Sequence, residues 1–278
     1  MRRQARNFLR SYARYRPPEI DRRLGALAAV IGRADPSLFA VSDLTRYEQK
    51  VFSQNGEDGV LVEIFNRIGT GNRFFVEFGI QNGTEGNAVL LADVFGWAGL
   101  FIEADPDDFA QVEEKYAGSQ VRVVRDLVTA ASIGGIFAAA DVPEEFDLLS
   151  IDIDGNDVYV WDALGGYRPR VVVIEYNAGI VADRPLAQPH DPERAWDGSG
   201  AFGSNLSGLE VVASRKGYRL AHSDLTGTNA FFVRDDLWGA LGIDRAPRRT
   251  QNFGLTGIRQ EPKEPPGGWV PVDQPSPE

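Results

Sequence analysis

The chain has 278 residues, of which 43% are hydrophobic and 25% charged, with a formal net charge of -11 and no cysteine. This length suits one large α/β domain or two small ones, and the missing thiols exclude disulfides, thiolate metal sites and cysteine nucleophiles. No apolar run is long enough to cross a bilayer, and the arginine-rich start lacks the apolar stretch of a signal peptide. We therefore expect a soluble cytoplasmic protein without a membrane partner.

The two ends of the chain differ from its centre. Residues 1–33 carry nine arginines against Glu19 and Asp21, so the rest of the chain is strongly acidic, which disfavours a nucleic-acid partner. Apolar residues recur there at helical spacing, and we predict two short amphipathic helices within an N-terminal helical cap, residues 1–70. The other end is rich in proline, glycine and charge, and it predicts an extended C-terminal tail over residues 237–278.

Strand-like and helix-like segments alternate between these ends, over residues 71–236. The predicted strands are 74–78, 99–104, 121–124, 147–153, 170–176, 218–223 and 230–234, and the predicted helices are 84–95, 106–117, 131–140, 156–165 and 205–216. The first five strands are nearly continuous apolar runs, typical of strands covered by helices on both faces. The last two are so close that they must form a hairpin, which makes the final strand antiparallel to its neighbour. The pattern predicts an α/β fold with a doubly wound, seven-stranded, mostly parallel sheet and one antiparallel strand.

Three glycines follow the first predicted strand: Gly79, Gly83 and Gly86. Ligands of open parallel sheets bind beyond the carboxyl ends of the strands, where glycines let backbone and ligand approach closely. We expect a branched side chain at Gly79 to block the ligand's path. The spacing G-x-x-x-G-x-x-G is longer than the dinucleotide fingerprint G-x-G-x-x-G, which argues against a pyrophosphate. With Glu77 and Glu103 ending the first two strands, a ligand with a cationic amino-acid portion and a ribose fits better than NAD or ATP.

Three motifs at these strand ends resemble those of the class I S-adenosylmethionine-dependent methyltransferases, and within them the FkbM-like group. They are "VEFGIQNGTEGN", "GLFIEADP" and "LLSIDIDGNDVYVWDAL", and "FSQNGEDGVLVEIF" is similar to the short helix that often precedes the first strand in that group. The resemblance covers roughly residues 50–235. It implies a Rossmann-like catalytic domain over residues 71–236, S-adenosyl-L-methionine as cofactor, and O-methylation of a hydroxyl on a sugar or another small metabolite.

The resemblance also implies cofactor contacts. Glu103 is expected to accept hydrogen bonds from the ribose hydroxyls, and Glu77 to contact the amino group of the methionine portion. The other expected cofactor-binding residues are Gly79, Gly83, Asn87, Ala104, Asp126 and Asp152, with Leu127 near the adenine ring. Three alternatives stay open: Glu77 only caps backbone amides, the glycines only form a turn, and Asp126 only starts a helix.

Acidic residues gather after the fourth and fifth predicted strands: Asp152, Asp154 and Asp157 after the fourth, and Glu175 with Asn177 at the end of the fifth. Such carboxylates repel one another, so a cation or a substrate donor is expected among them. We expect Asp152, Asp154 and Glu175 to take part in catalysis, aligning the acceptor and removing its proton.

A bound metal ion is one way to compensate the repulsion between these acids. Through "IDGN" the region also resembles macrolide-sugar O-methyltransferases, which hold a divalent cation at these two strand ends. This implies a Mg²⁺ site of Asp154, Glu175 and Asn177, whose oxygen ligands suit that ion. Because "EYN" stands where those enzymes carry paired aspartates, a metal-free acidic rim is the alternative.

The chain has two histidines, His190 and His222. His190 lies in a long connection, residues 177–203, of the kind that often acts as a lid. It is therefore a candidate general base, and a solvated loop histidine is the alternative. His222 is expected to be structural.

Three functions compete at this stage. The first is an O-methyltransferase for a small-molecule acceptor, and the second is a module that binds S-adenosylmethionine or a nucleotide without turnover. The acids after the fourth and fifth strands favour the enzyme, since a scaffold without activity needs none of them. A nicotinamide oxidoreductase is disfavoured by the lengthened glycine spacing. Homo-oligomerisation is left open.

Overall fold

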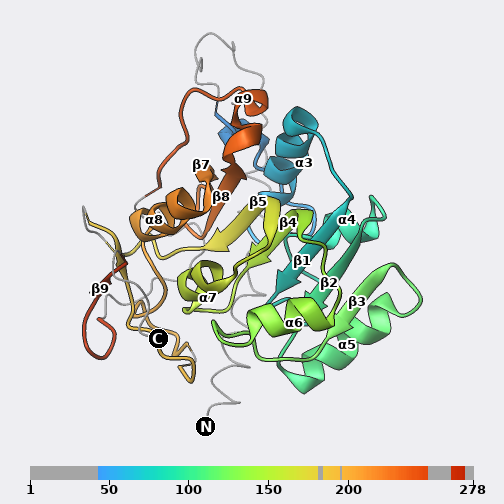
Figure 1. The fold of residues 1–278 in the computed structure, drawn as a ribbon, viewed down its shortest axis with the longest axis horizontal. Helices are drawn as coiled ribbons and strands as arrows, with labels where there is room; N and C mark the ends of the chain where they lie inside the picture. The colour runs from blue at the N-terminus through green and yellow to red at the C-terminus, as the bar shows by residue number, and fades with distance from the viewer. Residues whose placement is uncertain (1–42, 181–183, 195, 250–263, 273–278) are drawn as a thin grey trace, which may run out of the picture.

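The computed structural model describes residues 43–180, 184–194, 196–249 and 264–272. The strands of the main sheet are β1 (Phe74–Phe78), β2 (Ala98–Ile102), β3 (Val121–Val124), β4 (Glu145–Ile151), β5 (Arg168–Glu175), β7 (Tyr218–Ser223) and β8 (Asn229–Arg234). Their order across the sheet is β3-β2-β1-β4-β5-β8-β7 (Figure 1). Only β8 is reversed, because it pairs antiparallel with β5 and with β7 while the other neighbours pair in parallel. The predicted α/β fold, with a seven-stranded, mostly parallel sheet and one antiparallel strand, is confirmed.

Helices cover both faces of the sheet (Figure 1). They are α3 (Glu57–Ile68), α4 (Val89–Asp93), α5 (Pro106–Tyr116), α6 (Ile133–Ala139), α7 (Asp157–Ala163), α8 (Leu206–Lys216) and α9 (Trp238–Leu241), with short 3₁₀ turns η2 (Thr45–Tyr47) and η3 (Asp235–Leu237). Apolar residues of α6, α7 and α8 form one buried cluster with the sheet, and those of α3, α4, α5 and α9 form another on the opposite face. Among the described residues, no helix has the length and apolar character needed to span a bilayer.

The strand sequences explain this layering. In β5 the four consecutive residues 171–174 are all fully buried, and they alternate between the two clusters. When both faces of a strand are buried, all of its side chains must be apolar, and its sequence is a continuous hydrophobic run. The same alternation in β1 places Val76 and Phe78 against the α6–α8 side, which turns Phe75 and Glu77 toward α3 and α4.

Four segments differ from the sequence prediction or fall outside the described residues. The predicted helix 84–95 is helical only over α4, since residues 79–88 form an extended glycine loop. The long connection contains a short strand, β6 (Leu186–Ala187), which pairs antiparallel with β9 (Val270–Pro271) of the predicted tail. The tail also includes α9, so it is not extended throughout. The predicted helices of residues 1–33 lie outside the described residues.

The strand register aligns the carboxyl edge of the sheet. Phe78 is in register with Ile102 and with Ile151, and Ile151 with Ile174. Continuing this register by one residue brings Glu103, Gly79, Asp152 and Glu175 onto one row, which Asn229 extends as the observed partner of Glu175. We call these five residues the edge row. The amides of Gly79 and Glu103 still donate to neighbouring strands, to Ile102 and Val124, so the ladder continues to this level.

Within the edge row, the backbone at Gly79 lies so close to that at Asp152 that no side chain fits between them. The φ of Gly79 is +79°, and an added Cβ would lie 1.7 Å from the carbonyl oxygen of Asp152. From the sequence we expected a side chain at Gly79 to block the path of the ligand. The nearer obstacle is the protein's own backbone, at Asp152 directly after β4. Glycine is therefore required here by the close approach of two strand ends, before any ligand binds.

We expect Gly79→Ala to lower the free energy of unfolding by on the order of 3 kcal/mol or more, because a left-handed alanine is strained and the Asp152 carbonyl must move. Gly118→Ala is the matched control: its φ is +76°, yet nothing lies within 4 Å of an added Cβ. It should lose only about 1–2 kcal/mol. Urea unfolding measures both variants, and equal losses would contradict the backbone contact.

Candidate functional site

Glu77 holds the glycine loop against the sheet. It is 4% exposed, and its two carboxylate oxygens accept hydrogen bonds from the backbone amides of Asn87 (2.8 Å) and Ala88 (2.9 Å). The Ser150 hydroxyl also donates to Glu77, and the Asn87 side chain donates to that hydroxyl. Burial raises the pKa of Glu77 to about 7 despite these donors. This geometry is that of the capping alternative, and a contact with the methionine portion stays a prediction.

Glu103 is the member of the edge row that follows β2. It is 8% exposed, and its oxygens accept from the amides of Gln81 (2.7 Å) and Asp105 (2.8 Å). Burial raises its pKa, while these two bonds lower it. A carboxylate has about four lone-pair sites, so acceptor capacity remains for two ribose hydroxyls. Asp105 itself caps α5, accepting from the amides of residues 107 and 108.

An exposed leucine follows β3, the strand that pairs with β2. Leu127 is 57% exposed, and its backbone amide donates to the Asp126 side chain at 2.8 Å. Asp126 and Ala104 are both exposed. The expected position of Leu127 and Asp126 near an adenine ring stays a prediction.

The turn after β4 positions the acids. Asp154 has φ +58°, in the left-handed region that aspartate tolerates better than most residues. Asp157 holds the turn by accepting from the amides of Ile153 (2.9 Å) and Gly155 (2.8 Å). Burial raises the pKa of Asp157 to about 6. Asp157 therefore shapes the loop, and Asp154 projects from it at an exposed position.

Three acids converge at the edge row. Asp152, Asp154 and Glu175 each present one carboxylate oxygen such that these atoms all lie within 4.8 Å of one another. Burial raises the pKa values of Asp152 and Glu175 well above their usual range, and repulsion from neighbouring carboxylates adds to it. The sequence-based expectation that Asp152, Asp154 and Glu175 come together is met.

Asn177 organises the long connection. Its side-chain amide donates to the carbonyls of Gly200 (3.0 Å) and Phe202 (2.9 Å), and its side-chain oxygen accepts from the amide of Gly179. All of these bonds are made within the loop, so the described geometry uses Asn177 as a loop anchor. The metal set predicted from the sequence, Asp154, Glu175 and Asn177, stays a prediction; the fold brings oxygens of Asp154 and Glu175 together with one of Asp152.

The two histidines lie in different places. The His190 ring packs on the ring of Tyr159 of α7, with the centroids 4.9 Å apart, and its contact with a substrate stays a prediction. His222 is fully buried, and its Nε2 lies 2.8 Å from the Glu48 carboxylate. Burial lowers the pKa of His222 to about 4, so it stays neutral near pH 7. The structural role expected for His222 agrees with this environment.

The sequence reasoning missed Asn229 and Glu57. Asn229 is 2% exposed, and its side-chain amide donates to Glu57 at 2.8 Å. Glu57 in turn accepts from the backbone amides of Asn55 and Gly56. In the sequence these residues look ordinary, because Glu57 begins an amphipathic helix, where acids are common, and Asn229 only precedes a strand. Their polarity next to apolar runs was the one signal that could have singled them out.

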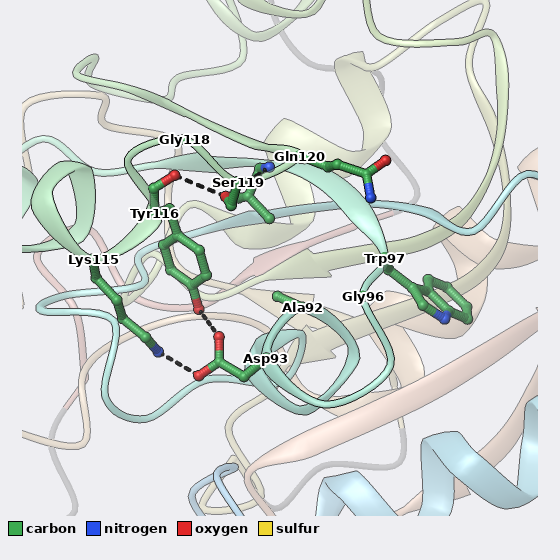
Figure 2. Close-up of a pocket in the computed structure, with 10 residues that line it drawn as sticks. Ala92, Asp93, Gly96, Trp97, Lys115, Tyr116, Gly118, Ser119 and Gln120 are labelled. Carbon is green, nitrogen blue, oxygen red and sulfur yellow. Dashed lines mark hydrogen bonds and ion pairs between the residues drawn. The ribbon is translucent and has the colours of Figure 1, made fainter.

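A separate pocket lies at the opposite edge of the sheet. Figure 2 shows Asp93 accepting a hydrogen bond from Tyr116 (2.9 Å) and pairing with Lys115 (2.7 Å), and Trp97 also lines this pocket. Trp97 immediately precedes β2, and the lining residue Gln120 immediately precedes β3. The pocket is thus at the amino ends of these strands. Ligands of doubly wound folds bind at the carboxyl ends, so we assign the functional site to the edge row.

Comparisons with known proteins relate the chain to methyltransferase structures only at the level of fold. No protein-family model and no curated protein matches the sequence. Among solved structures, it is similar to SAM-bound CalS10, an amino pentose methyltransferase from Micromonospora echinaspora, with 13% identity over 75% of this chain and 96% of that chain and a TM-score of 0.41. It is also similar to the CurJ carbon methyltransferase, with 10% identity over 73% and 62% of the two chains and a TM-score of 0.42.

A third similar structure is a candidate sarcosine dimethylglycine methyltransferase from Galdieria sulphuraria, with 15% identity, 46% of this chain and 45% of that chain covered, and a TM-score of 0.31. This chain therefore spans less than two thirds of that protein and of CurJ. Likeness of this degree concerns the fold alone, and the FkbM-like assignment stays a prediction.

We expect the protein to become less stable as the pH rises from about 5 to about 7.5. Burial raises the pKa of Glu77 and Asp224 to about 7 and that of Asp157 to about 6. The folded chain then binds more protons than the unfolded chain between the ordinary and the raised values, so stability falls through that window. The contribution of His222 to stability rises with pH below its ordinary pKa of 6.5, because its pKa is lowered in the folded chain. It is a single group, whereas the carboxyl groups named above are three.

The loss should be on the order of a few kcal/mol, since one pKa unit is worth about 1.4 kcal/mol. Thermal unfolding across this pH range measures it. Glu77→Gln removes one of the three groups and should flatten the slope, and a stability that rises with pH would show that these carboxyls are not destabilised by burial.

Proposed function

We propose that the protein is an S-adenosylmethionine-dependent methyltransferase that methylates a hydroxyl of a small molecule, with a sugar or another hydroxylated metabolite as the acceptor. The edge row carries this proposal. Glu103 lies at one end of it, and Asp152 and Glu175 lie on the other side of the glycine at position 79. An adenosine at Glu103 and an acceptor at the acids would meet across that glycine, where the backbone leaves room for close approach.

The residues on the cofactor side fit this group. Glu103 retains acceptor capacity for ribose, Leu127 exposes an apolar side chain for the base, and the Glu77 contacts hold the loop between them. When bound, S-adenosylmethionine supplies a methyl carbon on a positively charged sulfur, which an acceptor oxygen can attack directly. The protein therefore has to orient the acceptor in line and take its proton.

On the acceptor side we assign proton removal to Asp154. It is the exposed member of the three acids, so an acceptor can reach it. Asp152 and Glu175 each present an oxygen within 4.8 Å of one of Asp154, so an acceptor that reaches Asp154 lies next to both. The connection that Asn177 anchors, with His190 on it, would cover the acceptor.

A divalent cation among the same acids is the alternative way to activate the hydroxyl. Its support is the convergence of Asp152, Asp154 and Glu175, whose oxygen atoms are of the kind that Mg²⁺ prefers. We favour the metal-free route because Asn177, the expected neutral ligand, makes its hydrogen bonds to the loop. In an assay, a chelator would abolish a metal-assisted reaction and leave a metal-free one intact.

Glu103→Ala should weaken S-adenosylmethionine binding by about 1.5–3 kcal/mol, the size of a lost charge-assisted hydrogen bond. Isothermal titration with S-adenosylmethionine, S-adenosylhomocysteine and NAD measures this and tests the cofactor assignment at once. Unchanged affinity in the variant would refute the ribose contact. Tight binding of NAD instead would favour an oxidoreductase.

Asp154→Asn should reduce methyl transfer by about 10²–10⁴-fold, the usual contribution of a general base, and leave cofactor affinity nearly unchanged. The assay follows S-adenosylhomocysteine formed with a panel of hydroxylated acceptors. Asp162→Asn is the control, since Asp162 pairs with Arg215 on the outer side of α7. A wild-type rate in Asp154→Asn would rule out this base, and cofactor binding without turnover by the wild type on any acceptor would favour a binding module.

A further inference from the structure

Two residues that face each other at the edge row each have a buried oxygen atom without a donor among the described residues. Glu175 and Asn229 are direct partners in the antiparallel pairing of β5 and β8. Opposed residues in such a pair project from the same face of the sheet, with their Cβ atoms about 4.5–5.5 Å apart. Within the described part of the chain, Glu175 Oε2 and Asn229 Oδ1 are both buried and accept no hydrogen bond.

The orientation of Asn229 is determined by Glu57. Asn229 Nδ2 donates to Glu57 Oε1 at 2.8 Å, and Glu57 is in turn held by the amides of Asn55 and Gly56. Since the nitrogen and oxygen of an amide point in divergent directions, Oδ1 faces away from Glu57. A side chain that is 2% exposed keeps an acceptor unpaired only at a cost, and such cases are rare in folded proteins.

The surroundings of Glu175 are uniformly acidic. One oxygen of Glu175 lies within 4.8 Å of oxygens of Asp152 and Asp154. The four charged groups that act on it most strongly are all carboxylates: Asp152, Asp154, Asp157 and Asp224. A neutral ligand would leave this repulsion in place, whereas a cation with several donors would relieve it.

We infer that Asp152, Glu175 and Asn229 form a subsite for a protonated amine of the acceptor. The acceptor is then a hydroxylated molecule that carries an ammonium group close to the hydroxyl that is methylated. This inference rests on the proposed function and narrows its substrate class. In this assignment Asp154 is the proton acceptor for the hydroxyl and is not part of the amine subsite.

The chemistry of an ammonium group matches this subsite. It has three donors and no acceptor, whereas the subsite offers only acceptors. With N–H···O distances of about 2.8 Å and tetrahedral angles, two oxygens bound to one ammonium nitrogen lie about 4.6 Å apart. The limit of 4.8 Å between the acidic oxygens accommodates that spacing. A hydroxyl in the same position would donate once and leave the other acceptors unpaired.

The test uses the full chain loaded with S-adenosylhomocysteine and two probes of matched size, 2-amino-1,3-propanediol and glycerol. They differ only in an amine replacing a hydroxyl. Saturation-transfer NMR and titration should show the amine binding at least about tenfold more tightly than glycerol, as expected for a charge-assisted contact. Glu175→Gln should remove that preference without changing S-adenosylhomocysteine affinity, and Asp152→Asn, as a second variant, should weaken it.

The matched control is Glu145→Gln, the same substitution at the amino end of β4, where the side chain is 59% exposed. It should bind both probes as the wild type does. Three results would overturn the inference: no preference for the amine, displacement of the amine by Mg²⁺ with Mg²⁺ binding lost in Glu175→Gln, or weaker S-adenosylhomocysteine binding in that variant. The second would make the subsite a metal centre and the third a cofactor contact. If S-adenosylhomocysteine itself does not bind, the proposed function fails instead.

Discussion

The close approach of the β1 and β4 strand ends is the constraint on which the site depends. An added Cβ at Gly79 would lie 1.7 Å from the carbonyl oxygen of Asp152, so the two strands can end at one level only with glycine at this position. That shared level is what aligns Glu103 and Glu175 with them across the sheet. A side chain here would separate the acid that faces the cofactor side from the acids that face the acceptor side. A local steric condition thus determines the layout of the whole carboxyl edge.

Several buried carboxylates hold the loops around this edge in the same way, by accepting hydrogen bonds from backbone amides. Asp58 accepts the amides of residues 51–53, Asp224 accepts those of residues 227–229, and Glu77 accepts those of residues 87 and 88. Backbone amides compensate a buried negative charge without requiring a basic side chain. The loops can therefore be positioned in an acidic protein without arginines occupying the site. Glu175 differs in that, within the described part of the chain, no such set of amides holds it, although an unpaired buried oxygen is common to Glu175 (Oε2) and Asp58 (Oδ1).

This contrast gives the edge two chemically different halves. On the β1–β2 side the acids have their charges compensated by the loop backbone, and they present a prepared surface with the exposed Leu127 beyond it. On the β4–β5–β8 side neighbouring acids raise the pKa of Glu175, and among the described residues one oxygen each of Glu175 and Asn229 is buried without a donor. The first half is organised before a ligand arrives, and the second gains free energy when a donor enters it. Such an asymmetry suits a cofactor that is bound in the same way in every turnover and an acceptor whose donors supply the missing contacts.

The sequence by itself determined the helix layers, the doubly wound and mostly parallel sheet, and the reversed strand. Continuous apolar runs and short connections are local signals, and they are compatible with few topologies. It also located Glu103, Asp152 and Glu175 at strand ends. Only the tertiary structure decided which neighbours these acids meet. Asn229 joins Glu175 through antiparallel pairing of segments far apart in the chain, and Asn177, adjacent in sequence, makes its hydrogen bonds to the loop instead. Register and loop hydrogen bonds are non-local, so no pattern of residue types along the chain encodes them directly.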